Sequence, residues 1–135
     1  MMAALILAAG LLLSLPGEGL GEAPEARIPL VGLDGPQADA CSGIGRVTGL
    51  DPDDDYTLKV RDAPDGRGMQ TDKLNTATLV WLCEGNGSWQ GIVYAASGGD
   101  LGDCRVSSPS MRPEPYAGPC RHGWVEARYI QLIAG

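Results

Sequence analysis

TLVWLCEGNGSWQGIVYA, residues 78–95, is the stretch that decides the fold. Two apolar runs, 78–83 and 89–95, flank the turn formers at 85–88. Short runs rich in aromatic and β-branched residues, bounded by turn signals, are typical of buried β-strands. Asn86-Gly87 tolerates the positive φ angles of a tight turn. The stretch therefore predicts an antiparallel β-hairpin.

Strand signals continue on both sides of this hairpin. Residues 56–61 alternate between apolar and polar side chains, which is the period of a half-buried strand. Residues 43–50 predict a first strand and residues 123–130 a closing one, whereas 69–77 have a mixed pattern that assigns no element. Turn-forming residues separate the segments. Five short strands joined by turns predict an all-β chain, a small barrel or sandwich.

Composition excludes several classes of protein. The 135 residues leave room for one domain, since a domain takes about 100 to 200 residues. The 20 Gly and 10 Pro argue against a helix bundle, because both residues destabilise helix interiors. The net charge of −7 argues against nucleic-acid binding, which requires clustered Lys and Arg.

The N-terminus has the pattern of a secretory signal peptide. Residues 1–15 are apolar, shorter than the ~20 residues of a membrane helix, and small residues follow up to Ala23. No Lys or Arg precedes the run, so a buried helix or a short anchor is the alternative. We interpret 1–23 as a signal peptide and 24–40 as a flexible arm. Removing 1–23 takes away two of 17 acids and none of 10 bases, which leaves a net charge of −5.

The mature domain is then residues 41–135, with a long irregular loop at 96–121. We expect this form to be periplasmic or secreted, without a stable membrane span.

Four cysteines, Cys41, Cys83, Cys104 and Cys120, lie in this domain, and an even count in a small exported chain indicates disulfides. The nearest two are 16 residues apart and the chain has one His, which argues against a zinc site. Of three pairings we favour Cys104–Cys120, because the Pro- and Ser-rich segment between them has little else to hold it. Cys41 then pairs with Cys83.

The order of motifs over residues 43–133 resembles the bacterial Src-homology-3 (SH3-like) domain of exported proteins. The motifs are Val47–Leu50, Leu58-Lys59-Val60-Arg61 with Ala63-Pro64, Leu79–Cys83, Gly87-Ser88-Trp89, Gly123-Trp124-Val125 and Tyr129-Ile130. The long loop and the four cysteines depart from the family's pattern. The resemblance implies a five-stranded SH3-like barrel that acts as a non-catalytic binding module. Cell-wall peptide or a protein of the cell envelope is the ligand that it implies.

Aromatic residues mark the expected binding site. If Val80 faces the interior, as the family pattern implies, Trp81 faces outward, and Trp89 does so on the next strand. One interpretation is that the long loop covers this apolar patch, with Tyr116 or Met111 packing against it. The other is a ligand groove lined by Trp89 and Tyr129, with Trp81 and Tyr116 as further candidates. A further hypothesis has the proline-rich segment 109–119 docking into this groove.

The other candidate motifs give weaker evidence for a functional site. Asp51, Asp53, Asp55 and Asp62 have the spacing of a calcium loop, but its sixth position, which requires Gly, is Tyr56. Asp100 and Asp103 are acid–base candidates without companion residues, and no partner for His122 is evident. We therefore predict no catalytic residue, metal or cofactor. The alternative functions are a small exported hydrolase or inhibitor-like factor that uses loop 96–121, or a purely structural envelope protein.

Overall fold

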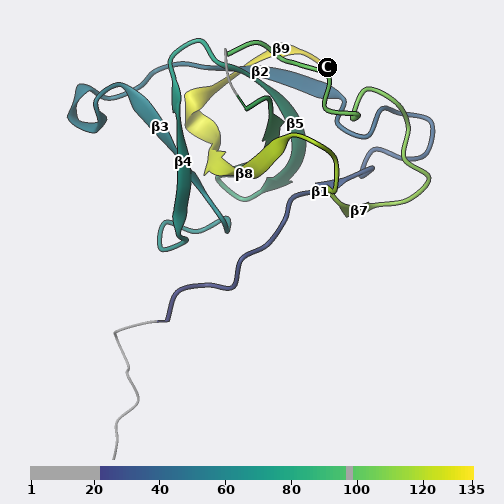
Figure 1. Ribbon diagram of the computed structural model, residues 1–135, viewed down its shortest axis with the longest axis horizontal. Coiled ribbons are helices and arrows are strands. Elements are labelled where there is room, and N and C mark those ends of the chain that lie inside the picture. Colours follow the sequence, from purple (N-terminus) through teal and green to yellow (C-terminus); the bar gives the residue numbers. More distant parts are fainter. Residues whose placement is uncertain (1–21, 97–98) are drawn as a thin grey trace, which may run out of the picture.

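The computed structural model describes residues 22–96 and 99–135, and these residues form an all-β structure (Figure 1). The strands are β1 (Leu30–Val31), β2 (Gly43–Val47), β3 (Thr57–Arg61), β4 (Gln70–Asn75), β5 (Leu79–Asn86), β6 (Trp89–Tyr94), β7 (Glu114–Pro115), β8 (Arg121–Glu126) and β9 (Ile130–Ala134). Two 3₁₀-helices, η1 (Pro52–Asp54) and η2 (Ala127–Tyr129), precede β3 and β9.

The strands form one large and one small antiparallel sheet. The large sheet has seven strands in the order β4-β3-β8-β6-β5-β2-β9, and it curls in Figure 1. β1 and β7 pair with each other beside it. β5 and β6 form the predicted hairpin, in which Asn86 pairs with Trp89 and Gly87 has a φ of 60°.

The seven strands exceed the five that the sequence predicts. β4 has no apolar alternation, because it is an edge strand on which only Leu74 is buried. The closing segment 123–130 is two strands, because η2 turns the chain after β8 and sends β9 back beside β2. The remaining predicted strands lie within a few residues of β2, β3, β5 and β6.

Each face of the sheet has its own apolar cluster. The inner cluster comprises Val47, Leu58, Val60, Leu74, Val80, Ile92, Tyr94 and Val125. The outer cluster comprises Val31, Ala40, Cys41, Val93, Cys104, Val106 and Tyr116, with Trp81, Cys83 and Cys120 packed against it. β5 and β6 contribute to both, which explains why 78–95 reads as two nearly continuous apolar runs.

Two irregular segments, 27–41 and 102–120, lie over the outer face, and we call them the cover. The first differs from the expected flexible arm. The Arg27 amide donates to the Asp62 carbonyl (2.8 Å) and Pro29 is fully buried. Gly91 permits this contact, because a Cβ there would lie 2.8 Å from Pro29 Cβ. These contacts are single and do not recur at a regular spacing in the sequence. A periodic pattern of apolar residues therefore does not predict that segment 27–41 packs on the sheet. Residues 1–21 lie outside the described residues, and the signal peptide stays a prediction.

A charged group fastens the cover to the sheet. Glu84 is 8% exposed, forms an ion pair with Arg27 and accepts a hydrogen bond from the Leu30 amide (2.9 Å). The Arg27 guanidinium lies 5.0 Å from the ring centroid of Trp124, whose Nε1 donates to the Arg27 carbonyl (2.6 Å). A buried carboxylate is tolerated because these partners compensate for its lost hydration.

Both predicted disulfides, Cys41–Cys83 and Cys104–Cys120, are confirmed. Cys41–Cys83 joins the cover to β5, and Cys104–Cys120 closes a loop within the cover. Disulfides persist in oxidising compartments, so the pair indicates an extracellular or periplasmic type of environment. In the residues that the structure describes, no helix is long and apolar enough to cross a bilayer.

Candidate functional site

The four aromatic residues expected at the groove lie in two places. Trp89 and Tyr129 line one cavity of about 90 Å³. Trp81 and Tyr116 instead belong to the outer cluster beneath the cover. The structure therefore brings together one pair of the predicted set and separates it from the other.

The Trp89–Tyr129 cavity is assembled by strand pairing. Trp89 begins β6 directly after the hairpin turn and pairs with Glu126 at the end of β8. Tyr129 ends η2, which follows Glu126 in the chain, and its ring packs against the inner cluster. The lining is completed by Leu50, Asp51, Asp54, Thr57, Leu58, Lys59, Arg61 and Glu126. Two half-buried rings thus face a space of about one aliphatic side chain.

Charges of both signs surround this cavity. Lys59 Nζ lies 3.7 Å from Asp54 Oδ1, and Arg128 lies 3.4 Å from Glu126 with its guanidinium 4.7 Å from the Tyr129 ring centroid. Solvent-exposed pairs of this kind contribute little stability, so a ligand can replace them at low cost. The arrangement suits an extended peptide that places one apolar side chain on the rings and polar groups against the rim.

Tyr116 has a structural role. It is 4% exposed, its hydroxyl donates to the Cys104 carbonyl (2.9 Å) and the same oxygen accepts from the Cys120 amide (2.9 Å). Burial raises the pKa of this phenol above its usual value. Trp81 Nε1 donates to the Gly102 carbonyl (3.4 Å), whereas Met111 is 84% exposed. The arrangement corresponds to the interpretation in which the loop covers the outer patch, through Tyr116 and not Met111.

The proline-rich segment does not lie on Trp89. Glu114–Pro115 is β7, in which Pro115 pairs with Leu30, and the Tyr116 amide donates to the Pro29 carbonyl (3.0 Å). The segment pairs with the N-terminal part of the cover, because an extended chain there satisfies backbone groups of both segments.

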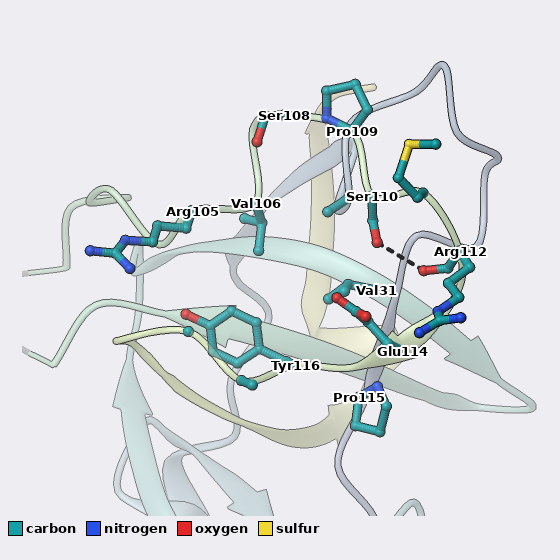
Figure 2. A pocket seen from close by; sticks show the side chains of 14 residues that line it. Val31, Arg105, Val106, Ser108, Pro109, Ser110, Arg112, Glu114, Pro115 and Tyr116 are labelled. Atoms are coloured by element: carbon teal, nitrogen blue, oxygen red, sulfur yellow. Dashed lines mark hydrogen bonds between the residues drawn. The ribbon is translucent and has the colours of Figure 1, made fainter.

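Tyr116 also borders a larger hollow, which we call the Tyr116 pocket (Figure 2). Its volume is about 560 Å³, and Val31, Val106 and Tyr116 form its apolar floor. Arg105 and Arg112 lie at opposite sides of it in Figure 2. Sequence reasoning missed this pocket, because its residues come from irregular segments without a pattern.

A third hollow, the His122 cleft, has a volume of about 540 Å³ and lies beside Asp72, Tyr94, Arg121 and His122. Asp72 Oδ2 accepts from the Tyr94 hydroxyl (2.9 Å) and from Arg121 (3.0 Å). Burial raises the pKa of Asp72, but these bonds and one from the Lys73 amide outweigh it and lower the pKa overall. The pKa of Tyr94 is raised far above its usual value. Burial is the largest cause, and the hydrogen bond to Asp72 is the next. Burial lowers the pKa of His122.

Sequence reasoning also missed Asp72, because it lies in the unassigned segment 69–77. Without the register of β4, nothing in the sequence places this carboxylate beside Tyr94 and Arg121.

The acidic cluster is accounted for by turn geometry. Asp51 accepts from the Asp53 amide (2.8 Å) and caps η1, while Asp62 accepts from the Met69 amide (2.9 Å) on the other side of β3. Among residues 22–96 and 99–135, no group of three or more His, Cys, Asp or Glu side chains is arranged to hold a metal ion.

Comparisons of the chain with protein-family models, with curated proteins and with solved structures found no match.

Proposed function

We propose that the chain is an exported, non-catalytic binding module of the bacterial Src-homology-3 type, and that its ligand is cell-wall peptide or a protein of the cell envelope. One observation carries the proposal. Trp89 and Tyr129, which are distant in the sequence, line one cavity with charges of both signs at its rim. Aromatic side chains offer a large contact area at a low cost in side-chain entropy, which suits them to peptide binding.

The position of the family-like motifs supports this proposal. The motifs begin on or directly next to β2, β3, β5, β6 and β8, and at the junction of η2 with β9, and these strands belong to one antiparallel sheet. β9 returns beside β2, so the closing segment lies next to the opening strand. A five-stranded SH3-like barrel built from this sheet, with β4 and the cover as additions, is the architecture that we propose.

Export is supported by the disulfides, because both bonds require an oxidising compartment to persist. A signal peptide over residues 1–23 would deliver the chain there. The proposed location is the periplasm or the cell exterior.

Sedimentation with purified peptidoglycan sacculi tests the function. We expect the wild type to bind and Trp89→Ala and Tyr129→Ala to lose at least about tenfold in affinity, the size of a typical hot-spot loss. Trp89→Phe retains an aromatic face and should bind nearly as well as the wild type. Leu33→Ala, which removes an exposed apolar side chain of the cover, is the matched control.

Each outcome decides one part of the proposal. Equal binding by wild type and Trp89→Ala would show that this cavity is not the site. If the wild type does not sediment, cell-wall peptide is excluded, and photo-crosslinking from position 89 in an envelope extract tests the protein ligand. Failure of the crosslinking as well would favour the purely structural alternative.

The hydrolase alternative draws less support from the geometry. Ser110, a loop serine that lines the Tyr116 pocket, donates its hydroxyl proton to the Arg112 carbonyl (2.8 Å). A nucleophilic serine would instead donate to a general base.

A further inference from the structure

We propose that the Tyr116 pocket binds an acidic peptide segment, with an apolar side chain on the pocket floor and carboxylates against Arg105 and Arg112. The proposal does not depend on the proposed function, because the Tyr116 pocket and the Trp89–Tyr129 cavity share no lining residue.

The floor of the pocket is apolar and comes from three segments. Val31, Val106 and Tyr116 are 6%, 1% and 4% exposed, and their side chains border the hollow in Figure 2. At about 560 Å³ the hollow is in the range of binding pockets, which are typically ~300 to 1,000 Å³. A side chain of leucine size that entered it would exchange water contacts for apolar ones.

The walls are held in place by backbone hydrogen bonds. The Ala40 amide donates to the Ser108 carbonyl (2.8 Å) and the Cys41 amide to the Val106 carbonyl (3.0 Å). At the far end Gly32 has a φ of 81°, and a Cβ there would lie 2.8 Å from the Arg112 carbonyl oxygen. The Cys104–Cys120 disulfide closes the loop. A ligand therefore meets a preformed pocket and pays little entropy to order it.

The charge of the pocket is opposite to that of the chain. The chain carries a net charge of −7. Across the described part of the chain, five of its cations form ion pairs, whereas Arg105 and Arg112 form neither an ion pair nor a side-chain hydrogen bond with other described residues. Glu114 is the one acidic side chain in the lining. Two guanidiniums without partners beside an apolar floor favour an anionic ligand with an apolar group.

The positions of the two arginines define the ligand further. Figure 2 shows Arg105 and Arg112 on opposite sides of the hollow, with the Arg105 guanidinium extending outward from it. A ligand that contacts both therefore needs carboxylates on both sides of its apolar group, and the one that meets Arg105 lies beyond the edge of the hollow. An extended peptide with Asp or Glu flanking a Leu has this chemistry. A small molecule with one carboxylate does not.

Fluorescence anisotropy with the labelled peptide Asp-Glu-Leu-Glu-Asp tests the proposal on the disulfide-bonded protein. We expect binding that weakens as NaCl is raised. The charge-reversal variant Arg105→Glu/Arg112→Glu should lose at least about tenfold in affinity. Arg46→Glu reverses an exposed arginine that does not line the pocket and also lacks an ion pair in the described residues, so it should bind like the wild type. Trp89→Ala should also bind normally, which separates this site from the proposed peptide cavity.

Four results of the anisotropy measurements on these proteins and peptides would overturn the proposal. The first is that the wild type does not bind the peptide up to about 1 mM, and the second is that Asp-Glu-Gly-Glu-Asp binds as tightly as the leucine peptide. The third is that Arg46→Glu loses as much affinity as the double variant, and the fourth is that the double variant loses no affinity. Ser108→Trp, which places a bulky ring at the rim, checks that the hollow is the binding site, and unchanged binding would contradict it. Analytical ultracentrifugation completes the test. A wild-type dimer that the double variant abolishes would make a second copy the occupant and overturn the peptide.

Discussion

The two faces of the sheet are buried in different ways. On the inner face, side chains from β2, β3, β4, β5, β6 and β8 form one cluster, and regular strand pairing positions all of them. On the outer face, the cover contains only two strands of two residues and one isolated bridge, Asp39–Pro109. Both disulfides and the Arg27–Glu84 pair lie on this side. An irregular segment can bury a sheet when covalent and charged contacts replace the strand ladder.

Detaching the cover should have the largest effect. The double variant Cys41→Ala/Cys83→Ala opens a loop with a sequence separation of 42, which in the chain-entropy model costs about 4 kcal/mol of unfolding free energy. Urea denaturation followed by Trp fluorescence measures the loss. The wild type in reductant should lose more than the double variant, because reductant also opens Cys104–Cys120. A change below about 1 kcal/mol would show that non-covalent contacts suffice to hold the cover.

The next largest effect should come from the inner cluster. Ile92 is fully buried, so Ile92→Ala should lower the free energy of unfolding by about 3 kcal/mol, and Ile92→Val by about 1 kcal/mol. Hydrogen exchange should accelerate in all strands of the large sheet and in the cover. Faster exchange confined to the cover would contradict the distinction between the two faces.

A smaller and local effect is expected at Tyr116. Tyr116→Phe removes both hydrogen bonds of the hydroxyl. The free energy of unfolding should fall by about 1.5 kcal/mol, because the buried Cys104 carbonyl and the Cys120 amide lose their partner. Amide exchange should accelerate at Cys120 while that of Ile92 stays slow. Tyr56→Phe, at an exposed tyrosine, is the matched control and should change neither.

The smallest effect should be a pH dependence at the border of the two regions. His122 lies beside the Tyr116 ring, with a centroid distance of 6.0 Å, and burial lowers its pKa in the folded state. The charged groups that share its cleft are Arg27, Asp62, Asp72 and Arg121. Between the lowered folded pKa and the unfolded value near 6.5, the unfolded chain binds more protons, so stability is present above pH 6.5 and declines as the pH falls.

Replacing His122 by Gln should remove this decline. Between pH 7 and pH 5 the free energy of unfolding of the wild type should fall relative to that of His122→Gln by well under about 1 kcal/mol, because the ring is only half-buried. Thermal melts across this range measure the difference. Asp72 acts in a lower window: its lowered pKa stabilises the fold above the usual carboxyl pKa, and this contribution is lost as the pH falls further.

The difference between the two regions also explains what the sequence could predict. Residues 78–95 gave a correct hairpin because a strand with both faces buried has a strong local pattern. The disulfide pairing followed from the need to hold the loop between Cys104 and Cys120. β4 was missed, since a polar edge strand such as Gln70–Asn75 has no apolar period.

The site was less predictable than the fold. Trp89 and Tyr129 share a cavity because η2 returns the chain to the start of β6, and motif order alone indicated their proximity. Arg105 and Arg112 were not predicted, because their positions depend on irregular backbone that local patterns do not encode. Pro29 is buried because it packs against Gly91, and this contact cannot be inferred from the composition of residues 24–40.

The two disulfides also determine how the protein would respond to mechanical force. A tension applied at both ends of the chain passes from Cys41 to Cys83 through the sulfur atoms, and again from Cys104 to Cys120. Once the sheet has unfolded, the polypeptide enclosed by the two bonds, roughly 200 Å when fully extended, therefore bears no load while the bonds are intact. β2, β3 and β4 all lie within the first enclosed loop. In a single-molecule pulling experiment this length should appear as missing extension, and a reductant should restore it.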